Sequence, residues 1–305
     1  MSPVVPQADS RIEVRKTYKL YVGGAFPRSE SGRSYAVTSS GRSARFLGNA
    51  AQASRKDVRD AVVAARAAQP AWAHATAYNR GQVLYRVAEV MEGRADQLAA
   101  DLRDAEGLTP ARARATVGAA IDRWVWYAGW SDKLAQVLGA VNPVAGPFLD
   151  ISAPEPTGVV GVLAPQRSSL LGLVSVIAPA LVSGNTVVVL ASEDRPLPAV
   201  TLAECLATSD VPGGVVNLLT GRTAELAPWL ASHRDVNALD LTGAADARDV
   251  AWGDLEAAAA DSLTRVLRPA GTGADAVEPD WARTPDLRRA RAFLETKTVW
   301  HPKGR

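Results

Sequence analysis

The chain has 305 residues, 47% of them hydrophobic and 22% charged, a composition typical of a globular protein of one or two domains. The net charge of +2 is too small to indicate nucleic-acid binding, and no apolar run reaches the ~20 residues that span a bilayer. The single cysteine, Cys205, excludes an intrachain disulfide, and the three histidines, His74, His233 and His301, lie in unrelated contexts. We therefore expect a cytoplasmic protein with no metal site and no nucleic-acid or membrane partner.

The first half of the chain predicts short strands followed by helices. Residues 1–18 read as irregular, and 19–37 as two short strands around a Gly/Ser/Pro turn. A helix over 54–73 opens with a capping box from Ser54 to Asp57. Ala-rich amphipathic helices follow over 78–92, 95–104 and 110–138. The last of them carries an aromatic group that favours helix packing, namely Trp124, Trp126, Tyr127 and Trp130.

From residue 157 onward, strands and helices alternate. Continuous Val/Leu runs predict strands over 157–164, 185–191, 214–221 and 237–243. Helical segments follow them over 168–182, 198–209, 223–233 and 247–267. Strands that are apolar throughout indicate a parallel sheet covered on both faces. The alternation therefore predicts an α/β fold with a doubly wound, Rossmann-like parallel sheet.

The segments that flank this core are irregular or β-rich. Residues 145–156 contain prolines and glycine and predict an exposed hairpin strand. Residues 270–286 are rich in Gly, Pro and Asp and read as a loop or mobile linker, followed by a brief helical turn over 287–292. The β-rich end predicts an assembly strand formed by Phe293, Leu294, Glu295, Thr296, Lys297, Thr298, Val299 and Trp300.

Several blocks of the sequence, in this order, resemble the aldehyde dehydrogenase superfamily. "KLYVGGAFPRSESGRSY" and "DAVVAARAAQPAWA" resemble its opening, and "FLETKTVWHP" resembles its last, oligomer-forming strand. Between them stand "EPTGVVGVLAP", "IAPALVSGNTVVVLASEDRPLPA", "VPGGVVNLLTG" and "DLTGA". The resemblance implies a cofactor-type domain with an N-terminal helical layer and a small β oligomerisation element.

This resemblance also implies that the catalytic domain is absent. About 50 residues separate Gly243 from Phe293, whereas an independent α/β domain needs ~100 or more. We accordingly divide the chain into N-terminal strands and helices (1–144), oligomerisation strands (145–156 and 287–305), a Rossmann-like core (157–269) and a linker (270–286). Loss of the catalytic domain should expose the sheet face that it covers in the family, and such a patch marks an interface.

The family's chemistry uses a cysteine thiolate, an oxyanion-binding asparagine, a glutamate base and a nicotinamide cofactor. The turn that holds the asparagine is matched here by Pro165, Gln166 and Arg167. No clear counterpart exists for the glutamate segment or the cysteine segment, and Cys205 lies inside a helix before the third strand. The resemblance therefore implies no catalytic residue. Arg167 instead either serves no catalytic role or binds an anion or a partner's carboxylate.

The cofactor-binding positions implied by the resemblance are also altered. Leu190 replaces the lysine that holds the adenosine ribose, while Glu193 keeps the matching glutamate. Gly221 remains from a glycine pair whose second member is now Thr223. Thr242 and Gly243 remain from a motif whose serine is lost. We therefore expect no cofactor on this chain.

A narrower resemblance is to the second, non-catalytic half of the family 16 aldehyde dehydrogenases. It rests on "IAPALVSGNTVVV" and "TKTVWHPKG". It implies an inactive pseudoenzyme that acts as a structural or regulatory subunit of a hetero-oligomer, in which an active aldehyde dehydrogenase carries NAD or NADP. One alternative is a homo-oligomer that binds a ligand or nucleotide near Glu193 without catalysis. An independent aldehyde-oxidising enzyme is disfavoured because no residue suits the nucleophile.

Overall fold

The computed structural model describes residues 16–41, 44–271 and 276–303. At its centre lies a five-stranded parallel sheet of order β10-β9-β6-β7-β8. These strands span Arg265–Leu267, Ala238–Asp240, Val159–Leu163, Thr186–Leu190 and Val216–Leu219. Every residue of β6, β7, β8 and β9 is buried, which explains their mostly apolar sequences. The prediction of a doubly wound α/β sheet is confirmed.

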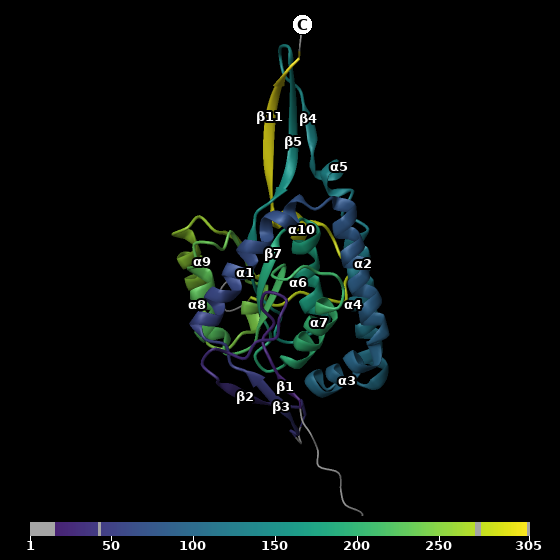
Figure 1. Cartoon of the computed structure of the whole chain (residues 1–305), viewed down its shortest axis with the longest axis vertical. Helices are drawn as coiled ribbons and strands as arrows, with labels where there is room; N and C mark the ends of the chain where they lie inside the picture. The colour runs from purple at the N-terminus through teal and green to yellow at the C-terminus, as the bar shows by residue number, and fades with distance from the viewer. Residues whose placement is uncertain (1–15, 42–43, 272–275, 304–305) are drawn as a thin grey trace, which may run out of the picture.

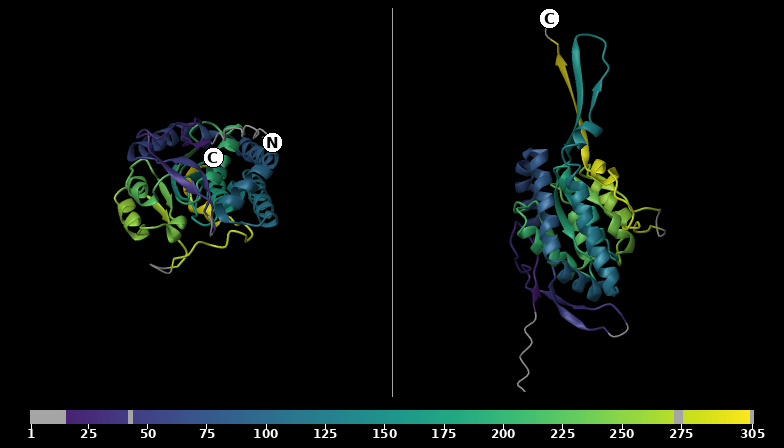
Figure 2. Two further views of the ribbon diagram at one scale, coloured as in Figure 1. Left: turned by 90° about the horizontal axis from the view of Figure 1, so that it is seen from below. Right: turned by 90° about the vertical axis from the view of Figure 1, so that its right-hand side faces the viewer.

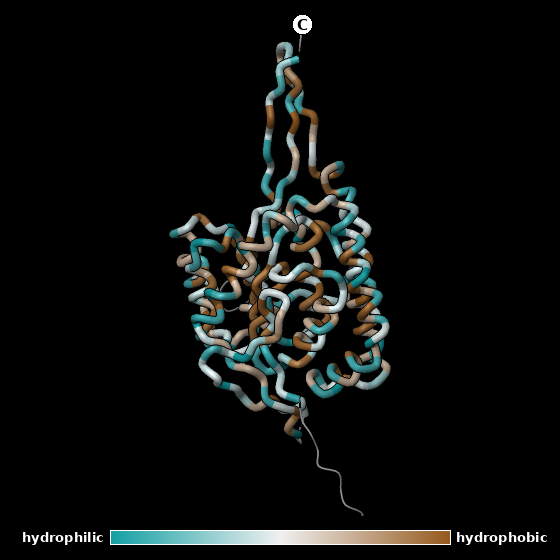
Figure 3. Tube along the Cα trace, in the orientation of Figure 1, coloured by the Kyte–Doolittle hydropathy of each residue, from teal (hydrophilic) through white to brown (hydrophobic). Residues whose placement is uncertain are grey.

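Helices cover both faces of this sheet (Figure 1). One face packs against α1 (Arg55–His74) and α8 (Thr223–Ala231), with α9 (Trp252–Ala260) beside α8. The other packs against α6 (Leu171–Val182) and α7 (Leu197–Ala207). An outer layer of α2 (Ala77–Gly93), α3 (Ala95–Glu106) and α4 (Pro110–Ala128) covers α6 and α7. Figure 3 shows apolar residues concentrated in the central strands between these layers.

The capping box at the start of α1 is confirmed. The Asp57 carboxylate accepts a 2.8 Å hydrogen bond from the Ser54 N–H, and the Ser54 hydroxyl accepts one of 3.4 Å from the Asp57 N–H. The same carboxylate accepts a hydrogen bond of 2.8 Å from the Ser29 hydroxyl. This cap therefore also fixes the loop before β2 onto the first helix.

The N-terminal strands differ from the expected hairpin over 19–37. The sheet has the order β1-β3-β2, with β1 at Thr17–Tyr18, β2 at Ser34–Thr38 and β3 at Phe46–Ala51. The partner of β2 is thus β3, whose Gly, Asn and Ala residues carry little intrinsic strand preference. Residues 1–15 of the segment expected to be irregular lie outside the described residues.

Two predicted helices are shorter than expected. The helix expected over 110–138 ends at Ala128, and a turn leads to α5 (Leu134–Leu138). In this turn the Lys133 ammonium donates a 2.8 Å hydrogen bond to the Gly129 carbonyl. The helix expected over 247–267 is instead a 3₁₀ turn η1 (Thr242–Asp246), α9 and strand β10. Leu263, at a φ of 55°, reverses the chain so that β10 adds to the sheet edge.

A second sheet projects from the body of the molecule (Figures 1 and 2). It has the antiparallel order β11-β5-β4, with β4 at Ala140–Asn142, β5 at Phe148–Pro156 and β11 at Leu294–Pro302. The register runs from Leu294 opposite Pro156 to Pro302 opposite Phe148. All β11 residues after Leu294 are exposed, and no residue of this sheet belongs to a core cluster. The strand predicted within 145–156 is confirmed.

Phe293 does not belong to the assembly strand, contrary to the prediction. It follows α10 (Arg288–Ala292), the expected helical turn, and its side chain is 0% exposed within the main core. Its carbonyl accepts hydrogen bonds from the Asn185 amide (2.8 Å) and the Thr157 N–H (3.1 Å). Phe293 therefore anchors the strand, which runs from Leu294 past Trp300 to Pro302. Residues 304–305 of the expected tail lie outside the described residues.

The segment expected to be a mobile linker is packed onto the body where the structure describes it. We call residues 276–293 the strap. Its Trp281 is 9% exposed and joins the main core, as do Ala290 and Phe293. The strap contacts α6 through α10. The strap thus covers apolar surface that we expected to be exposed. Residues 272–275 of the linker lie outside the described residues.

The anchoring role of Phe293 predicts a large cost for its truncation. We expect Phe293→Ala to lower the free energy of unfolding by about 3–5 kcal/mol, because it leaves a cavity in the core. The matched control is Trp300→Ala, in the same segment but 58% exposed, which should change the stability of the isolated chain by less than about 0.5 kcal/mol. Urea unfolding followed by circular dichroism measures both. Equal effects of the two substitutions would contradict this anchoring role.

Candidate functional site

The carboxyl edge of the parallel sheet is where ligands bind in open α/β folds. The turn after β6 holds Pro165, which is buried, and Gln166. The Gln166 amide donates a 2.8 Å hydrogen bond to the Ala164 carbonyl and accepts one of 3.0 Å from the Glu193 N–H. Its own carbonyl accepts 2.9 Å from the Ser192 hydroxyl. Gln166 therefore ties the turns after β6 and β7 together.

Arg167, the next residue, extends to the surface. Its side chain is 75% exposed and forms a 2.6 Å ion pair with Asp246 in η1. Its carbonyl accepts a 2.6 Å hydrogen bond from the Arg195 guanidinium. The carboxylate that Arg167 binds therefore belongs to this chain.

Glu193, which follows β7, is engaged on both carboxylate oxygens. One forms a 2.6 Å ion pair with Arg222, and the other accepts a 3.0 Å hydrogen bond from the Thr223 N–H at the start of α8. The Glu193 carbonyl accepts 3.1 Å from the hydroxyl of Tyr35, whose pKa is raised by burial. Leu190, at the end of β7, is 2% exposed. The carboxylate is thus held by contacts within the protein.

The remaining predicted positions are also used for internal packing. Gly221 has a φ of 148°, and a Cβ there would lie 3.1 Å from the Ala53 backbone nitrogen. A Cβ on Gly243 would clash with the Ala164 carbonyl. Thr242 is 2% exposed, and its N–H donates 3.0 Å to the Asp240 carboxylate. The close backbone approaches that the two glycines allow are to the chain's own backbone.

Asp240 is the most buried charge at this edge. Its side chain is 0% exposed and forms a 2.5 Å ion pair with Arg289 of the strap. Arg289 also donates 3.1 Å to the Thr242 hydroxyl and lies 5.0 Å from the centre of the Trp281 ring. The end of β9 is therefore covered by the strap.

Arg123 of α4 holds the strap from the opposite side. It is 7% exposed and donates to the Ser175 hydroxyl (2.6 Å) and to the carbonyls of Trp281 (2.9 Å) and Arg283 (3.0 Å). Burial lowers the pKa of its guanidinium. The sequence analysis did not identify Arg123 as a residue that holds the strap, although it lies among the buried residues of α4.

The strap also closes over the turn after β6. The Glu278 carboxylate accepts hydrogen bonds from the Gln166 N–H and, at 3.3 Å, from the Trp281 indole. Desolvation by burial raises its pKa, with a further contribution from Asp246. A cavity of about 400 Å³ lies here, lined by α4, the turn and the strap. Gln166, Arg167, Glu193, Thr242 and Gly243 thus lie at one edge of the sheet, and the strap covers part of it.

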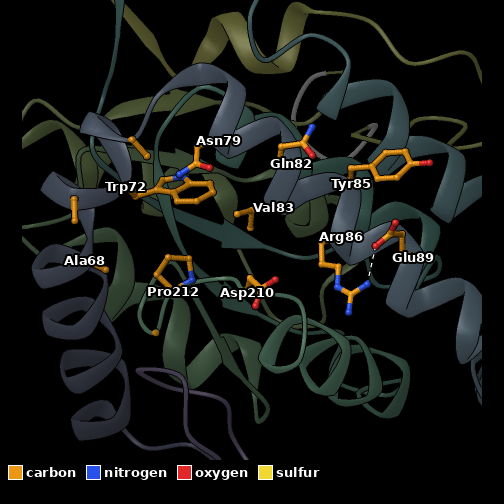
Figure 4. A pocket seen from close by; sticks show the side chains of 13 residues that line it. Ala68, Trp72, Asn79, Gln82, Val83, Tyr85, Arg86, Glu89, Asp210 and Pro212 are labelled. Carbon is orange, nitrogen blue, oxygen red and sulfur yellow. Dashed lines mark hydrogen bonds and ion pairs between the residues drawn. The ribbon is translucent and has the colours of Figure 1, made fainter.

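Two further cavities lie away from the strap. A cleft of about 330 Å³ beside β2 is lined by Tyr35, Glu193 and three arginines, Arg195, Arg222 and Arg248. A groove of about 680 Å³ lies between α1, α2 and the loop before β8. Its lining includes Trp72, Asn79, Gln82 and Tyr85 (Figure 4). None of the predicted site residues lines this groove.

Residues 26–268 match the model of the aldehyde dehydrogenase family. The chain belongs to this family. It is 32% identical over 249 residues to cytosolic 10-formyltetrahydrofolate dehydrogenase of Mus musculus, covering 79% of this chain and 27% of that protein. It is also 32% identical over 235 residues to alpha-ketoglutaric semialdehyde dehydrogenase of Bacillus subtilis, covering 77% and 48%. The chain therefore spans half or less of the length of these relatives.

Solved structures agree with this family assignment. HpcC from Thermus thermophilus has a TM-score of 0.76 at 32% identity, covering 82% of this chain and 47% of that one. PnpE from a Pseudomonas species has a TM-score of 0.75 at 28% identity, covering 82% and 50%. The family prediction is confirmed. No helix in the described ranges is long and apolar enough to cross a membrane, and no group of three or more potential ligands there could hold a metal ion.

The single thiol of this chain does not lie in an environment that activates a nucleophile. Cys205 is in α7, with a side chain that is 0% exposed. Desolvation by burial raises its pKa to about 11, although Arg94 opposes this shift. Because the thiolate is the reactive form, a thiol with this pKa is almost entirely inert at neutral pH.

We expect Cys205 to resist thiol reagents in the folded protein. At pH 8, labelling with an aromatic disulfide should be slower than in guanidinium-unfolded chain by at least a hundredfold, because the folded thiol is both neutral and buried. The unfolded chain is the control, and release of the chromophore measures both rates. Rapid labelling of the folded chain would contradict this assignment.

The raised pKa of Glu278 predicts a specific pH dependence of stability. A carboxyl with a raised folded pKa binds its proton more tightly when folded, so it favours folding at low pH. Relative to Glu278→Gln, the wild type should gain unfolding free energy as pH falls from the raised folded value toward the ordinary value near 4. Urea unfolding of both chains at several pH values measures the difference, in which other titrating groups cancel. A constant difference, or the opposite slope, would contradict the assignment.

Proposed function

We propose that this chain is a non-catalytic member of the aldehyde dehydrogenase family that serves as a structural or regulatory subunit. Its partner is a catalytic aldehyde dehydrogenase, which carries NAD or NADP and oxidises the aldehyde. The observation that carries the proposal is that the chain's own contacts occupy the ligand edge of the sheet. Glu193 is held by Arg222 and Thr223, and Asp240 by Arg289.

The chemistry of the chain supports the absence of catalysis. A nucleophile must be activated and must reach a site where a substrate binds. Cys205 is buried inside a helix, and its raised pKa keeps it neutral. The oxyanion-binding position carries Gln166, whose amide bonds the backbone of two turns instead of facing an open site. The similarity to the second half of the family 16 enzymes, which is non-catalytic, supports the same role.

The projecting sheet supports the role in assembly. Three antiparallel strands with both faces outside the core bury little apolar surface, and such a sheet is marginal unless something covers it. Val141, Ile151 and Val299 lie opposite one another in the register and are 71%, 39% and 47% exposed. An apolar row of this kind is typical of a surface that another subunit covers.

A second candidate function is the binding of an anionic ligand or nucleotide by a homo-oligomer without catalysis. The cleft beside β2, with its three arginines, favours it. A nucleotide would have to displace Arg222 from Glu193. Calorimetric titration with NAD and NADP at millimolar concentration tests this candidate, and absence of heat at that level rejects it.

The first test is recovery of the chain, tagged at its N-terminus, from the cells that make it. We expect a catalytic aldehyde dehydrogenase to be recovered in fixed ratio, because the projecting sheet requires a covering subunit. The purified chain alone should produce no NADH or NADPH from aldehydes. Identification of bound chains by mass spectrometry and absorbance at 340 nm measure these outcomes. Reduction of cofactor by the isolated chain would overturn the proposal.

A truncated variant tests whether β11 forms the contact with the catalytic partner. Ending the chain after Phe293 removes β11 but keeps the core side chain and its carbonyl contacts. This variant should retain the helical signal and cooperative unfolding of the wild type but lose the partner. Retention of the partner at the original ratio would show that β11 is not needed for assembly.

A further inference from the structure

Strand β11 is an open sheet edge along most of its length. It pairs with β5 on one side, and no described residue pairs with its other side. The hydrogen bonds that bracket the pairing, from Thr157 N–H to Phe293 carbonyl and from Lys303 N–H to Pro147 carbonyl, fix which residues face β5. Odd-numbered residues of β11 direct their backbone groups to β5. The even-numbered residues therefore direct theirs outward.

The outward-facing groups form a short, bounded run. At one end the Leu294 carbonyl already accepts a 2.6 Å hydrogen bond from Arg265. At the other end Pro302 has no N–H. The complete donor and acceptor pairs on this edge therefore belong to Thr296, Thr298 and Trp300, centred on Thr298. An unprotected edge of this kind is a template for another strand.

We infer that β11 pairs antiparallel with β11 of a second copy of this chain, about a two-fold axis at Thr298. This inference rests on the proposed role of the projecting sheet in assembly. It identifies a second copy of this chain as the partner that pairs with the β11 edge. Thr298 lies opposite Thr298 of the second copy, and Thr296 lies opposite Trp300 of the second copy. Every N–H and C=O of the outward run then has a partner, and the two sheets join into one.

The charges on β11 match this register. Glu295 lies opposite His301 of the second copy, so carboxylate and imidazole face one another on both sides of the axis. Lys297 lies opposite Val299 of the second copy, and its charge is already balanced by a 3.0 Å ion pair with Glu155 of its own chain. Between the two copies of β11, no two like charges stand directly opposite.

Neighbouring registers are less favourable. An axis at Lys297 places two lysines opposite each other, and like charges there destabilise a sheet. An axis at Val299 places Thr296 opposite Pro302, which lacks a donor, and Lys297 opposite His301. An axis at Thr296 requires the Leu294 carbonyl, which Arg265 already occupies. An axis at Trp300 places Thr298 opposite Pro302. Backbone groups and charges therefore select the same register.

The geometry gives a direct cross-linking test. On the axis, two copies of Thr298→Cys place their Cα atoms about 5.5 Å apart, within the range for a disulfide. Thr296→Cys is the control, since its copies are separated by about 13 Å along the strand. We expect mild oxidation to convert T298C, but not T296C, to a covalent species of twice the 32.1 kDa chain mass. Cys205 does not interfere, because it is buried.

A second pair of variants tests the pairing of β11 without a cross-linking reaction. Thr298→Pro removes an outward N–H and no backbone bond to β5, so the chain should fold but sediment as a monomer. The 2.8 Å hydrogen bond between the Thr298 and Ser152 hydroxyls is lost equally in Thr298→Ala, which controls for it. Thr298→Ala keeps the N–H and should sediment as a dimer, like the wild type. Failure of T298C to cross-link, a dimeric T298P chain or a monomeric wild type would each overturn the inference.

These outcomes are separable from those of the proposed function. A monomeric wild-type chain that still recovers a catalytic aldehyde dehydrogenase leaves the proposed function standing and rejects pairing through Thr298. A T298C cross-link in a chain that recovers no aldehyde dehydrogenase supports the pairing and rejects the proposed partner.

Discussion

The ion pair between Asp240 and Arg289 is the constraint on which most of the structure depends. A carboxylate that is 0% exposed must have a partner, because removing one member of a buried pair costs about 3–5 kcal/mol. Asp240 ends a strand of the parallel sheet, and Arg289 belongs to the strap. The pair therefore joins the sheet's ligand edge to a segment that follows it by almost fifty residues. It also fixes the position of α10, after which Phe293 enters the core and β11 begins.

The strap explains how the chain can be stable without a second domain over this edge. Its Trp281 and Phe293 fill the core beside α6, and large aromatic side chains each bury about 150–250 Å². Arg123 secures the strap's carbonyls, so the segment is held from α4 as well as from β9. The contacts that stabilise the strap are the same contacts that cover part of the ligand edge.

The sequence predicted the sheet because its signal is local. Val/Leu runs in β6 and β7 indicate burial on both faces whatever surrounds them. It did not predict β10, since Arg265–Leu267 is a strand only by pairing with β9. It also assigned Phe293 to the assembly strand, because alternation in a β-rich run does not show where burial stops. The strap was missed for a similar reason, because Gly- and Pro-rich composition indicates a turn-rich backbone but not whether the core holds it.

For the candidate site too, the sequence predicted local features but not the contacts between residues that are distant in the sequence. Residues at the ends of strands, such as Gln166 and Glu193, could be placed at one edge from the order of the elements alone. Their present roles could not, since Arg222, Arg123 and Arg289 are identified as partners only when the chain is folded. The polar groups at this edge are paired with one another, while the outward backbone groups of Thr296, Thr298 and Trp300 have no partner among the described residues. Unpaired backbone groups on a strand favour association, whereas paired side chains in a cleft oppose ligand entry. Both tendencies favour the binding of another chain at β11. They disfavour ligand binding and catalysis at the carboxyl edge of the parallel sheet.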